Sequence, residues 1–170
     1  MAPDIKFIAD SMLGKLARWL RAAGYDTTYD PFIADRELLR QARAEARIIL
    51  TRDSRMLEVR DIPPYLFIKD DYLEEQLAQV VQELGLEPND ADFVSRCLEC
   101  NSLLEEIPKS EVASLVPPYV FEKQNNFRRC PGCERIYWGG THVPRLKAKI
   151  RRLFGQRVGD PSPAEPQDSA

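Results

Sequence analysis

The sequence has no long apolar run. No stretch approaches the roughly 18 consecutive apolar residues that a membrane-spanning helix needs. The first residues also lack the charged start, apolar centre and small-residue cleavage site of a signal peptide. These two absences argue against a membrane protein and against a secreted one. We therefore expect a cytoplasmic protein with no membrane partner.

Cysteine and histidine are also scarce, with four cysteines and one histidine among 170 residues. Disulfides are rare in the reducing cytoplasm, so we do not expect a disulfide framework, and a metal is the better explanation of the cysteines. The lone His142 lies in a glycine-rich basic segment. It is either a surface or packing residue or a contact to substrate.

The four cysteines form two C-x-x-C pairs, "CLEC" and "CPGC". Each pair makes a tight turn that offers two thiolates, and two such turns complete a tetrahedral site for Zn²⁺. We predict a structural zinc that stabilises a small domain and takes no part in chemistry. A redox dithiol or an iron centre is the alternative. The predicted ligands are Cys97, Cys100, Cys130 and Cys133.

The formal net charge of −3 is small but unevenly distributed. Between residues 123 and 152, nine basic residues stand against the single acid Glu134; they are Lys123, Arg128, Arg129, Arg135, Arg145, Lys147, Lys149, Arg151 and Arg152. This asymmetry suggests a polyanion partner for the C-terminal part. A solvated basic helix on an acidic body is the alternative. Tyr137 and Trp138 could stack on bases or fill a small core.

Short apolar runs alternate with helical patterns in the first half of the chain. Strands are expected at 5–9, 26–29, 47–51 and 65–69, and helices at 11–24, 35–46 and 72–85. Strands that alternate with helices predict parallel strands joined by right-handed crossovers. The expected fold class is therefore α/β, with a parallel sheet flanked by helices.

The pattern changes near residue 90. Cysteines, prolines and short β-like pieces such as "YVFEK" and "RIYW" replace the strand and helix alternation. The end of the chain is polar and rich in proline, which is typical of disorder. We therefore divide the chain into an α/β domain at 1–89, a zinc-binding domain with a basic helix at 90–154, and a disordered tail at 155–170.

Acidic residues follow the predicted strands: Asp10, Asp35, Asp53, and Asp70 with Asp71. Strands of a parallel sheet end at one edge, where ligands bind. Carboxylates held close together repel unless a cation neutralises them, and Mg²⁺ or Mn²⁺ prefers such oxygen ligands. A metal-dependent nuclease is therefore one interpretation. The other is that each acid caps a helix or closes a turn.

One face of the first predicted helix carries Lys15, Arg18 and, less squarely, Arg21, and Lys15 follows Asp10 by little more than one turn. Cations beside an acidic metal site are what a phosphate backbone needs for positioning. Gly14 weakens this helix, which is tolerated where something approaches the backbone closely. The alternative is an ordinary amphipathic helix whose basic side faces water.

Four segments together resemble a known family, the Mut-seven C-terminal RNase domain. They are "FIADSMLGKLARWLRAAGYDT", "ILTRDSRML", "SRCLECNSLL" and "CPGCERIYWGGTH", and they span roughly residues 5 to 150. The resemblance implies a PIN-like nuclease domain with a Cys₄ zinc ribbon, acting on RNA with Mg²⁺ or Mn²⁺.

The resemblance also implies roles for particular residues. By motif position, Asp10, Asp35 and Asp53 would be the metal-binding catalytic acids, with Asp71 rather than Asp70 as a fourth. Lys15, Arg18 and Arg52 match basic positions of the family and would hold phosphate. We add Arg145 and Lys147, from the basic helix, as RNA contacts. The expected partner is single-stranded or tRNA-like RNA, and no protein partner can be named.

Two rival functions remain open. A non-catalytic RNA-, tRNA- or ribosome-binding module would use the zinc ribbon and leave the acids as caps. A receiver-like phospho-acceptor domain also places Asp after its first and third strands, but it usually needs a paired acid where this chain has "ADSM".

Overall fold

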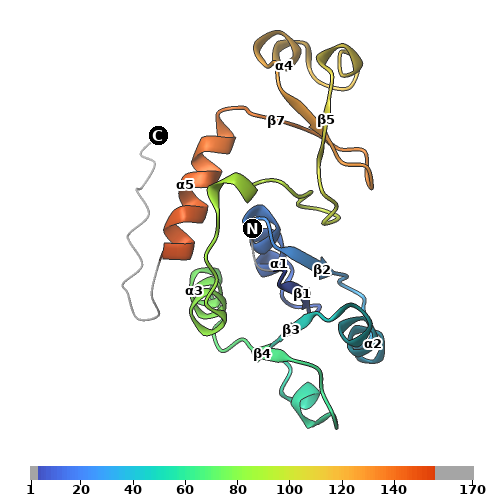
Figure 1. The fold of residues 1–170 in the computed structure, drawn as a ribbon, viewed down its shortest axis with the longest axis vertical. Helices are drawn as coiled ribbons and strands as arrows, with labels where there is room; N and C mark the ends of the chain where they lie inside the picture. Colours follow the sequence, from blue (N-terminus) through green and yellow to red (C-terminus); the bar gives the residue numbers. More distant parts are fainter. Residues whose placement is uncertain (1–3, 156–170) are drawn as a thin grey trace.

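A computed structural model describes residues 4–155 of the chain. A four-stranded parallel sheet, in the order β2-β1-β3-β4, forms the centre of the first part. Its strands are β1 (Lys6–Ala9), β2 (Asp26–Tyr29), β3 (Ile48–Thr51) and β4 (Tyr65–Phe67). The connecting helices are α1 (Gly14–Ala22), α2 (Asp35–Glu45) and α3 (Leu73–Leu84) (Figure 1). The expected α/β class with a parallel sheet is confirmed.

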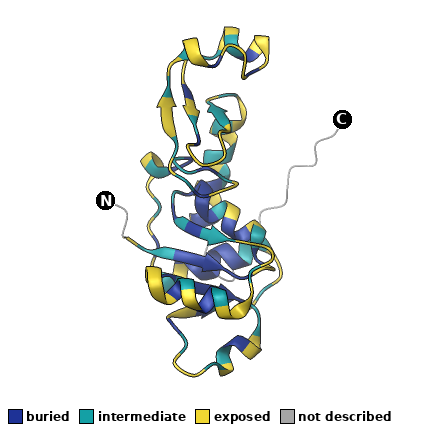
Figure 2. Cartoon of the chain, turned by 90° about the vertical axis from the view of Figure 1, so that its right-hand side faces the viewer, coloured by how far each residue is buried: buried dark blue, intermediate teal, exposed yellow. Residues whose placement is uncertain are grey.

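The sheet buries both of its faces. Side chains alternate along a strand, so Phe7 and Ala9 of β1 face one side while Ile8 faces the other. The Phe7 side packs on α1 and α3, and the Ile8 side packs on Leu38 and Leu39 of α2. Buried residues accordingly concentrate in this layered body (Figure 2).

A second, three-stranded antiparallel sheet lies in the cysteine-containing half. Its strands, in the order β5-β6-β7, are β5 (Glu105–Ile107), β6 (Phe127–Arg129) and β7 (Ile136–Trp138). The prediction of a strand at "RIYW" is confirmed by β7. The β-like assignment of "YVFEK" is wrong, because this segment lies in helix α4 (Pro118–Lys123). Proline fits the first turn of a helix, and Pro118 begins this one.

Residues 4–155 also contain three short 3₁₀ helices: η1 (Ser54–Glu58), η2 (Asp90–Asp92) and η3 (Lys109–Glu111). The small core of the second sheet contains Val112, Val116, Val120 and Phe127. No helix among residues 4–155 is both long and apolar enough to cross a membrane.

The basic helix α5 (His142–Gly155) packs on the α/β body. Ile150, Leu153 and Phe154 are buried in the same cluster as α1 and α3. The Phe154 ring stacks on Tyr25 with ring centroids 6.4 Å apart. The sequence position predicts that this helix belongs to the zinc-binding part. Its apolar face packs instead into the core of the α/β part. The predicted disordered tail lies outside the described residues, except for Gly155.

Candidate functional site

The carboxyl edge, where strands β1 to β4 end, carries a buried acid. Asp10 directly follows β1, and only 5% of its surface is exposed. Its Oδ1 accepts a hydrogen bond from the Ser11 amide at 2.7 Å, and its Oδ2 accepts one from the Thr51 hydroxyl at 2.8 Å. No basic side chain within residues 4–155 forms an ion pair with it. Among the described residues, therefore, this buried carboxylate is held by hydrogen bonds alone and has no basic partner at ion-pair distance.

Thr51 joins two of the predicted acids. It is the last residue of β3 and is fully buried. Its hydroxyl donates to Asp10 and accepts a hydrogen bond from the Asp53 amide at 3.0 Å. We did not predict this residue from the sequence. The available signal was a hydroxyl side chain at the end of an otherwise apolar strand, directly before Arg52 and Asp53.

Asp53 closes the turn that begins η1. Its Oδ1 accepts from the Arg55 amide at 2.9 Å, and its Oδ2 forms an ion pair with the Arg55 Nη2 at 2.9 Å. The hydrogen bonds from Arg55 hold the pKa of Asp53 below its ordinary value. The turn-closing interpretation is thus confirmed for Asp53. The carboxylate stays ionised at neutral pH, as a cation ligand must.

Asp35 and Asp10 do not cap their helices. The N-cap of α2 is Ala34 and that of α1 is Leu13, and neither makes a side-chain capping bond. Asp35 is instead the exposed first residue of α2. The pKa of Arg55 is raised chiefly by Asp53 and to a smaller extent by Asp35, so both acids act on the same guanidinium.

The remaining acids lie in the loop after β4. The Asp70 carboxylate accepts from the Tyr72 amide at 2.9 Å, so Asp70 closes a turn. Asp71 is exposed and forms an ion pair with Arg52, with the Arg52 Nη2 2.6 Å from the Asp71 Oδ1. The structure therefore turns the Arg52 side chain toward an acid.

The structure does not gather the carboxylates into one tight cluster. Within the described residues, the only group of three or more Asp, Glu, His or Cys side chains with mutually close ligand atoms is the four cysteines. Asp10 and Asp53 are connected through Thr51, and Asp35 is connected to Asp53 through the charge of Arg55.

The predicted phosphate-binding residues of α1 differ in their surroundings. Lys15 is exposed. Arg18 is exposed too, but it forms an ion pair with Glu99 of the "CLEC" turn. A side chain added at Gly14 would come within 2.8 Å of the Tyr29 ring. The absence of a side chain at Gly14 therefore leaves room for the ring of Tyr29 of β2, which approaches the helix backbone closely.

The four cysteine sulfurs fit a zinc ion. They lie within 4.8 Å of one another. The Cys97 and Cys133 sulfurs are 3.6 Å apart, and those of Cys100 and Cys130 are 3.2 Å apart. Tetrahedral zinc with bonds of about 2.3 Å separates its sulfur ligands by roughly 3.8 Å. Four thiolates at these spacings can close the coordination shell of one Zn²⁺.

Neighbouring groups favour the thiolate form of two cysteines. Burial acts to raise the pKa of Cys100, but hydrogen bonding to Ser102 and the neighbouring cysteines outweighs burial and lowers that pKa to about 6. The pKa of Cys97 is lowered in the same way, with Tyr137 as its chief partner. The Tyr137 hydroxyl lies 3.1 Å from the Cys97 sulfur. Tyr137 therefore supports the turn that carries Cys97.

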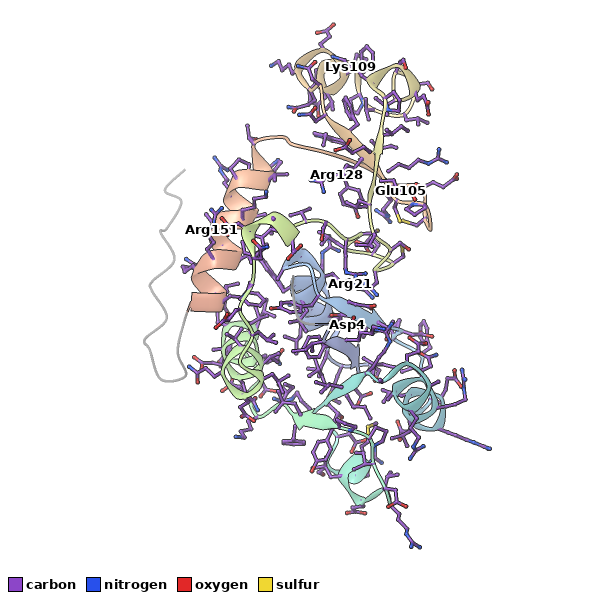
Figure 3. The ribbon with its side chains drawn as sticks, in the orientation of Figure 1. Asp4, Arg21, Glu105, Lys109, Arg128 and Arg151 are labelled. Atoms are coloured by element: carbon purple, nitrogen blue, oxygen red, sulfur yellow. The ribbon has the colours of Figure 1, made fainter. Side chains whose placement is uncertain are left out.

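The "CLEC" turn covers the free edge of β2. The Asn101 Oδ1 accepts from the Thr27 amide at 2.9 Å, and its Nδ2 donates to Asp26 at 2.7 Å. The buried Arg21 of α1 donates to the Thr27 carbonyl at 2.8 Å and to the Leu98 carbonyl at 3.0 Å. Figure 3 labels Arg21 where the parallel-sheet part meets the cysteine-containing part. The cysteine site and the parallel sheet are thus joined by hydrogen bonds at one strand.

These features define an α/β protein with acids along its carboxyl edge and an attached cluster of four cysteines that could hold a metal ion. The family model of the Mut7-C RNAse domain matches residues 5–150, and the chain belongs to this family. The resemblance found in the four sequence motifs is confirmed. No curated protein and no solved structure shows significant similarity to the chain.

Proposed function

We propose that the protein is a metal-dependent ribonuclease whose site is the carboxyl edge. The observation that carries this proposal is Asp10, a buried carboxylate with no ion pair to any basic residue of the described chain. Buried charges in proteins are paired or bind metals, because an unbalanced charge is costly to bury. Membership in an RNase domain family supports RNA as the substrate.

The acids and their supports have separate roles in this proposal. Asp10, Asp35 and Asp53 hold Mg²⁺ or Mn²⁺. When bound, such an ion supplies an activated water for attack on a phosphodiester. Thr51 fixes the orientation of Asp10 relative to Asp53. The motif positions support a PIN-like assignment of this domain.

Basic residues would hold the phosphates of the substrate. Lys15 and Arg18 lie on α1, and Arg52 lies beside Asp53. Asp71 contributes to the site through its ion pair with Arg52, which holds the guanidinium at the carboxyl edge. Its role is therefore to position Arg52 as well as to add negative charge.

The zinc ribbon would assist RNA binding through a groove of about 780 Å³ between its sheet and α5. Lys109, Arg128 and Lys147 are cationic residues that line it, together with Trp138. Cations combined with an aromatic ring suit single-stranded RNA. Arg145 lies on the same helix and is exposed, so it would contact RNA outside the groove.

The proposed domain boundaries follow from the roles given to the carboxyl edge and to the zinc ribbon. We propose a nuclease domain at 1–89 and a zinc-ribbon domain at 90–154, with α5 lying against the nuclease domain. Four free cysteines suit a reducing compartment, which supports a cytoplasmic protein.

A non-catalytic RNA-binding module is the second candidate. It is favoured because the described acids form no group of three with mutually close carboxylates, and because Arg55 makes an ion pair with Asp53. In that case the acids only close turns, and the groove of the zinc ribbon binds the RNA.

The test is cleavage of a labelled single-stranded RNA by zinc-loaded protein, with and without added Mg²⁺ or Mn²⁺. We expect cleavage that depends on the added ion and is abolished by Asp53→Asn or Asp10→Asn. The matched control is Asp61→Asn, an exposed acid in the loop before β4, which should cleave like the wild type. Equal RNA binding by all variants with no cleavage would favour the binding module.

A further inference from the structure

Two large aromatic side chains are exposed to solvent at the carboxyl edge. Phe32, in the loop after β2, is 92% exposed, and Tyr72, in the loop after β4, is 75% exposed. Exposing an apolar ring of this size forgoes the stabilisation that its burial would give. Two such residues on one edge therefore point to a binding role.

Matching turns hold both aromatic residues in place. After β2, the Asp30 carboxylate accepts from the Phe32 amide at 2.9 Å. After β4, the Asp70 carboxylate accepts from the Tyr72 amide at the same distance. Each strand is thus followed by an aspartate that fixes the backbone of the aromatic residue two positions later.

The sheet order places these aromatic residues on either side of the acids. Across the carboxyl edge the strands run β2-β1-β3-β4. Phe32 follows β2, Asp10 follows β1, Asp53 follows β3, and Tyr72 follows β4. Three strand spacings separate β2 from β4, which is about 14 Å. The two acids that Thr51 connects therefore follow the two inner strands, and the two aromatic residues follow the two outer strands.

We propose that Phe32 and Tyr72 stack on unpaired bases of a single-stranded RNA, on either side of the phosphate that lies at Asp10 and Asp53. This inference rests on the proposed function and adds the two residues that would bind the bases of the substrate. Aromatic rings stack on bases of any sequence, because every base has a π-face. In a duplex the bases already stack on one another, so the two rings select single strands.

Charge at the same edge favours RNA over an apolar partner. The exposed Arg55 lies in η1, which follows β3, and the exposed Lys15 lies in α1, which follows β1. Single-strand binding sites combine such cations, which follow the phosphates, with rings that stack on bases. An apolar protein partner would bury these charges and the acids without balancing them.

The experiment measures RNA affinity without cleavage. It uses zinc-loaded Asp53→Asn protein without added divalent ion and two probes of equal length, an oligouridine and the same oligomer with abasic residues. Phe32→Ala and Tyr72→Ala are each expected to weaken oligouridine binding about 5- to 150-fold. Neither should change binding of the abasic probe, because that probe keeps its phosphates but has no bases. The matched control is Tyr119→Ala, a 64% exposed aromatic of α4 in the ribbon, which should leave both affinities unchanged.

Equal losses on both probes, or no loss on either, would overturn the stacking role. An effect of Phe32→Ala on double-stranded RNA as large as on the single strand would also overturn it. The result is separable from the proposed function. Base-dependent binding by a protein that cuts no RNA with any divalent ion would refute the nuclease and keep this inference. Normal cleavage kinetics in the Phe32→Ala and Tyr72→Ala variants would keep the nuclease proposal and refute the stacking inference.

Discussion

At the scale of single residues, Thr51 links two strand ends, since its buried hydroxyl donates to Asp10 and accepts from the Asp53 amide. Thr51→Val removes both hydrogen bonds but keeps the shape of the side chain. We expect the free energy of unfolding to fall by about 1–3 kcal/mol, because two buried polar groups lose a partner. Urea unfolding measures this change. Thr51→Ser keeps the hydroxyl and should lose less; an equal loss in both variants would contradict the hydrogen-bond explanation.

Asp26 gives a prediction for pH dependence. Burial acts to raise the pKa of its carboxyl, but hydrogen bonds from Arg47 and Asn101 outweigh burial, so the pKa lies below its ordinary value. A carboxyl whose pKa is lower in the folded chain adds stability that is present above its unfolded pKa of about 4. That stability is lost as pH falls through the folded pKa.

We therefore compare wild type with Asp26→Asn by urea unfolding at several pH values. The wild type should be more stable at pH 7, and the difference between the two proteins should shrink below pH about 4. Because both proteins lose zinc in acid, the difference isolates Asp26. A difference that stays constant down to pH about 3 would contradict the predicted role of its ion pair with Arg47.

At the scale of elements, much of the parallel sheet could be predicted from local sequence. Apolar runs and helical periodicity mark β1 to β4 and α1 to α3, because each element has a regular spacing of buried positions. The error at "YVFEK" has a local cause: its aromatic and β-branched residues favour a strand, whereas two preceding prolines start a helix.

The contact between the "CLEC" turn and β2 gives a prediction at this scale. Asn101 occupies the left-handed region, with φ of 74°, and satisfies the amide of an edge strand. Asn101→Ala should lower the free energy of unfolding by about 1–3 kcal/mol and speed hydrogen exchange of the Thr27 amide. Asn101→Gly is the matched variant, because it removes the side chain without strain at this φ. If Thr27 exchange is unchanged in both variants, Asn101 does not protect the strand edge.

At the scale of the whole molecule, the sequence could indicate which residues carry chemistry but not how they meet. The cysteine spacing pointed to a metal site, because each pair needs only a local turn. The link from Asp10 through Thr51 to Asp53 joins adjacent strands that are distant in sequence. Similarly, the docking of α5 on α3 depends on tertiary packing that helical periodicity does not specify.

The zinc site should stabilise more than its own turn, because the "CLEC" segment accepts hydrogen bonds from Arg21 of α1 and the following Asn101 bonds to β2. We expect one Zn²⁺ per chain by metal analysis, and none after Cys130→Ser. That variant should also unfold at a lower temperature, including the far-ultraviolet signal of the α/β part. Full zinc content in Cys130→Ser, or an unchanged melting temperature, would contradict this account.

The central claim is that the buried Asp10 carboxylate is neutralised by a divalent cation. The most direct measurement is Mn²⁺ binding to zinc-loaded protein, followed by electron paramagnetic resonance, for wild type, Asp10→Asn and the control Asp61→Asn. We predict that the wild type and Asp61→Asn bind Mn²⁺ alike and that Asp10→Asn loses this binding. Equal Mn²⁺ binding by wild type and Asp10→Asn, or none by the wild type with or without RNA, would contradict the claim.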